Sequence, residues 1–425
     1  MLFGVAGLSL ERPALFKQNH EIALSRFTSN KLTLSACCST HGIQDGLSSS
    51  IYVLLPILAQ NFGLGYAQIG LIRTVNSVAM WLLEIPAGIL SEHFGERRLI
   101  LLGLTGAGVG YCALSLAGGY YGVLLALFVA GCGAAFQHSL CSSLISRSYG
   151  EPERRIALGS YNASGDTGKL VFTLVASLLL GIGVGWESIS LGFGLLAAAA
   201  AVAIWILLRT IRSGVSPVIK SKFAAGNSGW GIQDQIGFGT LAAIVFLDIS
   251  VQSGFLVFIA FVMIEKQVST GLVAFAVTAT LCGGVCGKFA GGYLAARIGV
   301  IRSLFFFELF TAAGIMLVFF VPGNTSFFLL PLVGVVLQGS SSITYGTVGN
   351  FVHDQRQSRG FATIYTIANA ASVTGPVLFG LVGDSLGIKV TMTVMAVLTL
   401  VPLPLCFPLR SALRRNAMPS GRKPA

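Results

Sequence analysis

Twelve apolar runs, each about as long as a membrane-spanning helix, restrict what this sequence can fold into. A helix needs about 20 mostly apolar residues to cross the hydrocarbon core of a bilayer. Hydrophobic residues make up 54% of the chain and charged residues only 10%, whereas soluble domains carry about 25% charged residues. The sequence therefore predicts an all-α membrane protein with twelve transmembrane helices. The runs lie near residues 33–60, 67–90, 99–117, 120–145, 156–182 and 187–208, and near 238–263, 271–296, 303–321, 325–350, 360–383 and 388–408.

The twelve runs form two sets of six, separated by a basic segment that contains Gly, Ser and Pro and predicts a linker. An offset of about 204 residues relates the two sets, because Gly88 and Gly95 have the same spacing as Gly292 and Gly299. Such an offset indicates a duplicated architecture, here two pseudo-symmetric six-helix bundles. We predict a cytoplasmic tail over 1–32, a bundle over 33–208, a cytoplasmic linker over 209–237, a bundle over 238–408 and a cytoplasmic tail over 409–425.

The Lys and Arg residues predict the orientation, since basic residues collect in cytoplasmic loops. If both ends are cytoplasmic, only Lys266 and Lys389 of the 27 Lys and Arg face outward, while Arg73, Lys169 and Lys288 lie within spans. We expect a monomer in the inner (cytoplasmic) membrane of a bacterium, with both termini inside. The net charge of +11 follows from these loops. No polar domain provides a nucleic-acid surface.

The loop between the second and third spans carries a recognisable motif. Its residues 88–98 are GILSEHFGERR and resemble the G-x-L-x-D-R-x-G-R-[KR]-[KR] loop of the major facilitator superfamily. Glu92 and His93 depart from the usual Asp and Arg. The resemblance implies two halves that rock around a site near the middle of the membrane. It also implies a gating role at the inner mouth, and the alternative is a surface ion pair worth under about 1 kcal/mol. The gating residues would be Gly88, Glu92, Gly95, Arg97 and Arg98.

Three further segments resemble the fosmidomycin-resistance exporter group of that superfamily. They are His41-Gly42-Ile43-Gln44-Asp45-Gly46 in the first span, Gly131-x-Gly133 followed by Phe136-Gln137-His138 in the fourth, and Gly165-Asp166-x-Gly168 in the fifth. The Gly-Pro dipeptide that antiporters of the superfamily often carry in the fifth span is missing. Gly375-Pro376 in the eleventh span is the nearest one. Both antiport and symport are therefore open.

Ionisable residues inside the spans are candidate functional residues, because a charge at the bilayer centre costs at least about 2.5–3.5 kcal/mol. His41 and Asp45 are four residues apart and share a helix face, and His138 is expected at a comparable depth. A buried carboxylate beside a His is suited to passing protons. We predict that Asp45 carries the transported proton with help from His41 or His138. The alternative is a polar pair that locks the first span to the fourth.

Other polar groups at similar depth are candidates for binding the substrate. They are Arg73, Asn76, Gln137, Asp166, Lys169, Asp248 and Lys288. We expect Arg73 and Lys169 to hold any negative part of the substrate.

These charged groups also have structural alternatives. Asp166 and Lys169, three residues apart, can neutralise each other. Asp248 and Lys288 can pair across neighbouring helices. Glu308, near the start of the ninth span, is expected at the membrane interface.

No motif for catalysis or for a bound cofactor occurs in the sequence. It contains no P-loop that would support ATP-driven transport. The eight cysteines lie in or beside apolar runs, as packing residues do, and no ligand spacing predicts a metal site. We therefore expect a secondary transporter and not an enzyme. It would need no cofactor, because the proton gradient drives it, and its partners would be a small molecule, H⁺ and the bilayer.

The function we expect is export of a small polar or amphipathic organic compound in exchange for protons. Two other transport functions are open: uptake of an organic anion with protons, and export of a metal or metal chelate through His41, Asp45 and His138. A membrane sensor or scaffold is the alternative from another class. It would need a polar signalling domain, and the sequence has no long polar stretch.

Overall fold

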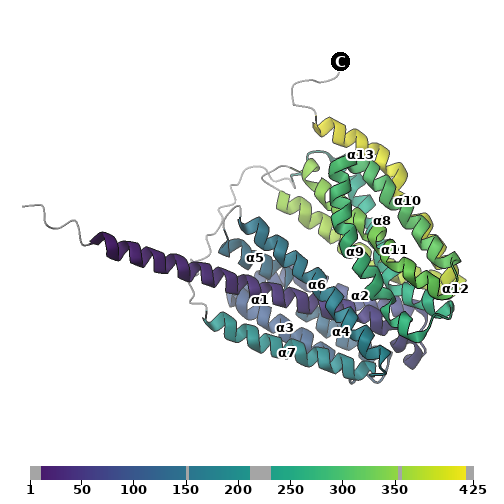
Figure 1. Cartoon of the computed structure of the whole chain (residues 1–425), viewed down its shortest axis with the longest axis horizontal. Helices are drawn as coiled ribbons and strands as arrows, with labels where there is room; N and C mark the ends of the chain where they lie inside the picture. Colours follow the sequence, from purple (N-terminus) through teal and green to yellow (C-terminus); the bar gives the residue numbers. More distant parts are fainter. Residues whose placement is uncertain (1–10, 150–152, 211–230, 353–356, 418–425) are drawn as a thin grey trace, which may run out of the picture.

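A computed structural model describes residues 11–149, 153–210, 231–352 and 357–417. These residues are almost wholly helical, and the helices form two groups that follow the order of the chain (Figure 1). The first group comprises α1 (Glu11–Phe62), α2 (Tyr66–Phe94), α3 (Glu96–Leu114), α4 (Tyr120–Ala134), α5 (His138–Ser148), α6 (Glu153–Gly181) and α7 (Trp186–Thr210). The second comprises α8 (Gln235–Glu265), α9 (Thr270–Ile298), α10 (Val300–Phe320), α11 (Gly323–Thr347), a short 3₁₀ turn (Val348–Phe351), α12 (Gln357–Leu398) and α13 (Pro402–Ala417).

The two groups repeat the same backbone turns. Left-handed backbone occurs at Gly63, Gly95 and Gly183 in the first group and at Gln267, Gly299 and Gly387 in the second, and each pair is 204 residues apart. Gly95 (φ 83°) separates α2 from α3, and Gly299 (φ 87°) separates α9 from α10. Glycine suits both positions because it has no Cβ to oppose a positive φ. The duplicated architecture predicted from the sequence is therefore confirmed.

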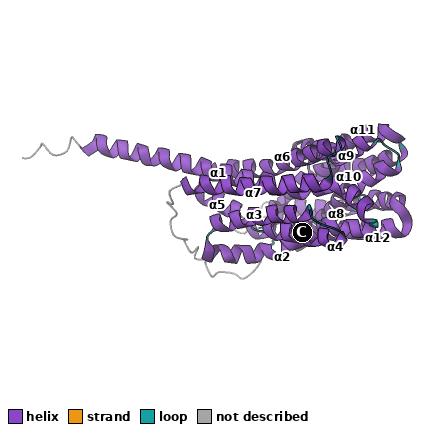
Figure 2. Ribbon diagram, turned by 90° about the horizontal axis from the view of Figure 1, so that it is seen from below, coloured by secondary structure: helices purple, strands orange, loops and turns teal. Residues whose placement is uncertain are grey.

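The helices lie side by side (Figure 2), and most of them are strongly apolar. Nine stretches of the described residues are long and apolar enough to cross a membrane. The last of them runs through α12 and α13 and covers the eleventh and twelfth predicted spans. Helices α2 and α3 occupy the second and third predicted positions. Large apolar side chains such as Leu125, Leu195 and Phe320 are exposed on the outside, as contact with lipid requires.

Two pairs of helices join the halves: α2 packs on α12, and α6 packs on α9. At one end of the molecule, the backbone N–H groups of Tyr66 and Ala67 donate to the two carboxylate oxygens of Asp384 over 2.6 and 2.9 Å. Close by, a Cβ on Gly70 would lie 2.5 Å from the carbonyl oxygen of Pro376. Toward the ends that carry α5 and α13, the two groups of helices diverge (Figure 1). The halves therefore meet closely at the Tyr66 end, and their helices diverge toward the other end.

Helix α1 is longer than the first predicted span, and it projects past its neighbours (Figure 1). It begins at Glu11, so the part of the predicted tail over 11–32 is helical. The tail residues before Glu11, most of the predicted linker and residues 418–425 lie outside the described residues.

The fourth predicted span is divided into α4 and α5. The backbone N–H groups of Phe136 and Gln137 bond to the carbonyls three residues before them, which is the tighter 3₁₀ pattern. Gly133 lies so close to α3 that a Cβ would be 2.3 Å from the nitrogen of Ala107. This break makes His138 the first residue of α5.

Candidate functional site

The site is built on a close contact between α1 and α6. A Cβ on Gly168 of α6 would lie 1.9 Å from the carbonyl oxygen of Gly42 on α1, and a Cβ on Gly165 would lie 2.5 Å from Nε2 of His41. Small residues three or four positions apart on one helix allow the backbone of a second helix to approach closely. The glycines of the fifth-span motif therefore bring the polar side chains of the two helices together.

His41 is held in one tautomer by its partners. Its Nδ1 lies 2.8 Å from the backbone carbonyl oxygen of Tyr161, and because a carbonyl only accepts, Nδ1 carries the hydrogen. The ring stacks on that of Tyr161 with centroids 4.1 Å apart. Its other nitrogen, Nε2, lies 3.3 Å from Oδ2 of Asp45. In the neutral ring, Nε2 is thus a basic atom that faces the carboxylate.

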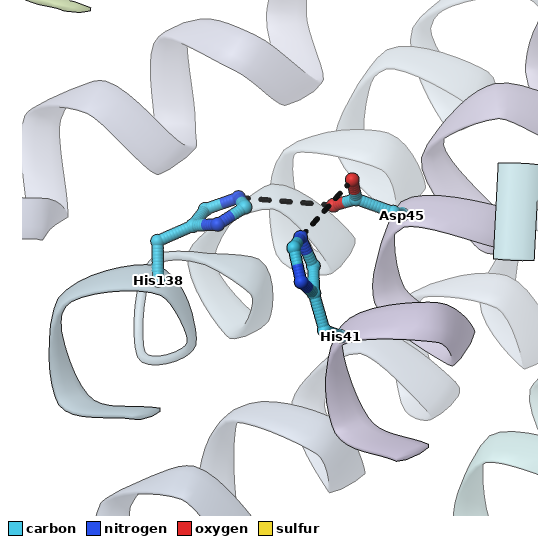
Figure 3. Close-up of side chains that lie close together, drawn as sticks. All are labelled: His41, Asp45 and His138. Atoms are coloured by element: carbon cyan, nitrogen blue, oxygen red, sulfur yellow. Dashed lines mark ion pairs between the residues drawn. The ribbon is translucent and has the colours of Figure 1, made fainter. Parts of the chain in front are cut away.

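Asp45 is surrounded by basic groups from three helices. Besides His41 on its own helix, Nε2 of His138 on α5 lies 3.7 Å from Oδ1 of Asp45, as Figure 3 shows. The ammonium of Lys169 on α6 lies 3.1 Å from Oδ2. The Asp45 side chain is 13% exposed. The Lys169 ammonium attracts the Asp45 carboxylate directly, whereas Nε2 of His41 can bond to it only when a proton lies between the two atoms. The structure brings Asp45, His41 and His138 into one cluster, and their role in proton coupling stays a prediction.

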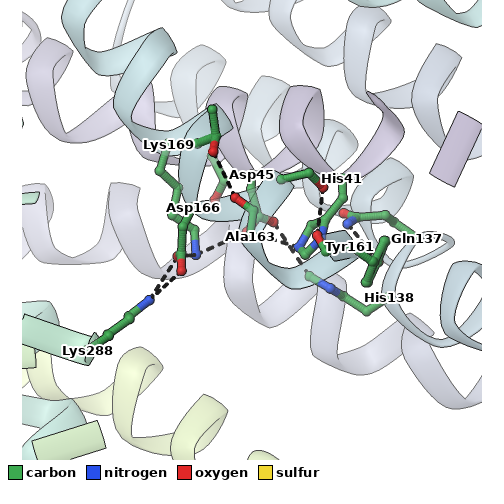
Figure 4. Close-up of polar contacts among 12 residues, drawn as sticks. His41, Asp45, Gln137, His138, Tyr161, Ala163, Asp166, Lys169 and Lys288 are labelled. Atoms are coloured by element: carbon green, nitrogen blue, oxygen red, sulfur yellow. Dashed lines mark hydrogen bonds and ion pairs between the residues drawn. The ribbon is translucent and has the colours of Figure 1, made fainter. Parts of the chain in front are cut away.

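The charges continue from Asp45 to the other half of the protein (Figure 4). Lys169 also lies 3.3 Å from Oδ1 of Asp166, as expected for a pair three residues apart. Lys288 on α9 donates to both oxygens of Asp166 over 2.8 and 3.0 Å. The side chains of Lys169, Asp166 and Lys288 are 35%, 28% and 33% exposed. Asp45, Lys169, Asp166 and Lys288 therefore form an ion-pair chain that links α1 to α9.

The predicted pairing of Asp248 with Lys288 is wrong, because Lys288 binds Asp166 of the other half. Asp248 of α8 instead contacts Glu308 of α10 by a side-chain hydrogen bond. Glu308 is 1% exposed, so its side chain is enclosed by the protein, and its expected place at the membrane interface stays a prediction. Its position within the apolar helix α10 was the signal for burial.

Three other predicted substrate residues lie apart from the ion-pair chain or at its edge. The guanidinium of Arg73 lies 4.5 Å from the ring centre of Tyr52 and donates to Ser77 over 2.9 Å. Asn76 bonds to Leu127 and accepts from Ser48, and so connects α2 to α4 and α1. Gln137 donates to the hydroxyl of Tyr161 over 3.2 Å, next to His41.

The loop between α2 and α3 is partly described. Gly95 makes the turn, Arg97 is half-buried and Arg98 is exposed. Gly88 and Glu92 belong to α2, but the surroundings of Gly88 and the side chain of Glu92 are outside what the structure describes. The gating role stays a prediction.

His41, Asp45 and His138 also meet a geometric condition for binding a metal. Their ligand atoms lie within 4.8 Å of one another, and imidazole and carboxylate are ligands of zinc and related ions. A cation there would compete with Lys169, which already lies 3.1 Å from Asp45.

Two helical halves that repeat the same turns in the same order, joined by a chain of buried and half-buried charges, define a multi-pass membrane transporter built from parallel repeats. The chain belongs to the Major Facilitator Superfamily, whose sequence model matches residues 38–233 and 239–424. It is an MFS-type transporter.

Known relatives agree with this assignment. An uncharacterized MFS-type transporter of Bacillus subtilis (strain 168), YfnC, is 25% identical over 84% of this chain and 88% of its own length. The fosmidomycin resistance protein of Escherichia coli (strain K12) is 26% identical over 35% of this chain and 36% of its own length. The crystal structure of a bacterial homologue of the human lysosomal transporter Spinster, inward-facing and unoccupied, superposes with a TM-score of 0.80. It covers 92% of this chain and 99% of its own, at 16% identity, and shows the shared fold.

Proposed function

We propose that this transporter is proton-coupled, with Asp45 as the proton carrier, and that it exports a small organic compound in exchange for protons. The observation that supports this most directly is the pair of facing acceptors, Nε2 of His41 and Oδ2 of Asp45, 3.3 Å apart. A proton between them can be held by either group, as in a relay. His138, at 3.7 Å, offers a second group that exchanges the proton.

Protonation of Asp45 would loosen the contact between the halves. A neutral Asp45 no longer attracts Lys169, so Lys169 keeps Asp166 as its carboxylate partner. Asp166 is then shared more strongly with Lys169 and less with Lys288 of α9. The movement of one half past the other is in this way tied to the charge of Asp45.

The same chain favours a substrate with a negative group. Lys169 and Lys288 are both about one-third exposed, so an acidic group can approach them and compete with Asp166. Arg73 provides a third cation on α2. We propose that the protein is a monomer in the bacterial cytoplasmic membrane, and the distribution of Lys and Arg supports an orientation with both termini inside.

Proteoliposomes with an acidic interior test the coupling and its direction, with fosmidomycin as the first probe because of the Escherichia coli relative. Antiport predicts that the probe accumulates inside while protons leave. Symport predicts that a preloaded probe leaves together with protons. Asp45→Asn should abolish gradient-driven movement, because an amide carries no exchangeable acid proton. Asp234→Asn is the matched control, since Asp234 pairs with Arg415 outside the spans. Full gradient-driven transport by Asp45→Asn would refute the proposal.

Metal export is a second candidate, favoured by the 4.8 Å grouping of His41, Asp45 and His138. The same proteoliposomes, loaded with Zn²⁺ and an internal zinc dye, test it. Zinc flux that requires both imidazoles, with no flux of organic probes, would favour this candidate over the organic exporter.

A further inference from the structure

Two acidic side chains meet inside the carboxyl-terminal half, away from the ion-pair chain. Asp248 projects from α8 and Glu308 from α10. Their residues are 8% and 1% exposed. The carboxyl groups hydrogen-bond to each other, and the Ser340 hydroxyl of α11 bonds to Asp248. Both acids are thus enclosed by the helices of one bundle.

The contact between these carboxyl groups requires a proton. An ionised carboxylate only accepts hydrogen bonds, so two carboxylates cannot bond to each other. Oδ2 of Asp248 and Oε1 of Glu308 are also buried without any donor among the described residues. Two like charges side by side in an apolar interior are strongly disfavoured. A proton between the groups provides the missing donor and removes one charge.

The groups that surround the pair are acidic or neutral. Tyr345 of α11 is near enough to Asp248, and Cys406 of α13 to both acids, for electrostatic interaction. Tyr365 of α12 stacks on Tyr345 with ring centroids 5.1 Å apart. In the part of the chain that the structure describes, neither acid forms an ion pair with a Lys, Arg or His. Lys288 of α9, in the same half, is bound to Asp166 instead.

The repeat relates Asp248 to a position next to that of Asp45. An offset of 204 residues maps Asp45 to within one residue of Asp248, and it maps Tyr161 onto Tyr365. Asp45 has a cation and two imidazoles beside it, whereas Asp248 has a second carboxyl group. The acid on the first helix of each half thus has different partners, which are basic in the amino-terminal half and acidic in the carboxyl-terminal half.

We propose that Asp248 and Glu308 share one proton at neutral pH, and that they form a proton-binding site separate from Asp45. The proton lies between the two carboxyl groups, and the Ser340 hydroxyl supports the remaining negative charge on Asp248. This site does not depend on the coupling role proposed for Asp45.

Infrared difference spectroscopy of the purified full-length protein tests the proposal. A protonated carboxyl group has a C=O stretching band that an ionised carboxylate lacks, and the band shifts in D₂O. Wild-type protein at neutral pH should show this band. The double variant Asp248→Asn and Glu308→Gln should lose it completely, while its paired amides keep the shape and the hydrogen bond. Asp45→Asn, at the repeat-related position, should retain the band at wild-type intensity.

The proposal is overturned if wild-type protein shows no such band, or if the double variant keeps it. Should the double variant fail to fold, Glu308→Gln alone decides, since its amide replaces the protonated carboxyl as the donor to Asp248. The wild-type band must then vanish or move to a new frequency, because any remaining protonated carboxyl belongs to Asp248. A band unchanged in position and intensity overturns the proposal.

Discussion

Lys288 on α9 lies 2.8 Å from Oδ1 of Asp166 on α6, and this ion pair joins the two halves of the transporter. Asp166 is shared, because Lys169 of its own helix lies 3.3 Å from the same oxygen. Loss of Lys288 therefore leaves Asp166 with a partner, whereas loss of Asp166 leaves Lys288 without a carboxylate. The two ends of one ion pair are not equivalent.

This asymmetry predicts that Asp166→Asn lowers the thermal unfolding temperature more than Lys288→Gln does. Partly exposed ion pairs are worth about 1 kcal/mol or less, so Lys288→Gln should cost no more than that. A double-mutant cycle in detergent checks the coupling. The double variant should be no less stable than Asp166→Asn alone. Strictly additive losses would mean that the pair contributes no interaction energy.

The hydrogen bonds of Asp384 lead to a prediction about the stability of the contact between the halves at the Tyr66 end. Its carboxylate accepts from the backbone of Tyr66 and Ala67 at the start of α2. Removal of a side chain that bonds to the first N–H groups of a helix costs about 1 kcal/mol, a factor of about 5 in an equilibrium. Asp384→Ala should therefore speed hydrogen exchange of these two amides about fivefold.

Mass spectrometry of the exchanged peptides supplies an internal control for Asp384→Ala. The start of α9 at Thr270 is the repeat counterpart of the start of α2, and Asp384 does not bond to it. Exchange there should be unchanged. Equal acceleration at both helix starts would indicate general loosening and contradict a local closing role.

Much of the fold was predictable because periodic apolar runs and paired glycines are local signals. The runs placed the helices, and Gly95 and Gly299 identified the repeat that their φ angles now confirm. His41 and Asp45 were predicted together because a spacing of four fixes a shared helix face. The division of the fourth span was missed, since it depends on the contact of Gly133 with α3.

Partners between distant helices were less predictable. Asp248 and Lys288 lie on consecutive helices of one half, yet Lys288 reaches across to Asp166 and Asp248 bonds to Glu308. Which partner each side chain contacts depends on the orientation of its helix about the helix axis, and the spacing of residues in the sequence does not specify that orientation. For the same reason, Asp384 was not among the predicted functional residues. Its partners are backbone groups of the other half.

Close helix packing in the carboxyl-terminal half predicts a sharp difference between two glycines of α9. A Cβ on Gly283 would lie 1.8 Å from the carbonyl oxygen of Pro331 on α11, whereas a Cβ on Gly292 would have nothing within 4 Å. Gly283→Ala should destabilise the protein by about 1–3 kcal/mol through overpacking. Gly292→Ala should be neutral or stabilising by up to about 1 kcal/mol, because Ala favours the helix. Thermal unfolding of both variants checks this, and equal effects would contradict the packing.

The contacts of Asp234 at the start of α8 predict that the Tm of the protein depends on pH. The backbone N–H of Gly237 and the Arg415 guanidinium, 2.9 Å away, hold the pKa of the Asp234 carboxyl below its ordinary value. Because the folded-state pKa is lowered, the carboxylate stabilises the fold above the ordinary Asp pKa of about 3.9. That stabilisation is lost as the pH falls through the folded-state value. The Tm of wild-type protein should therefore exceed that of Asp234→Asn most at neutral pH, and the difference should shrink as the pH is lowered. Arg415→Gln should remove only part of it, since the bond from Gly237 persists. A Tm difference that stays constant or grows toward acid would show that Asp234 acts through its shape and not through its charge.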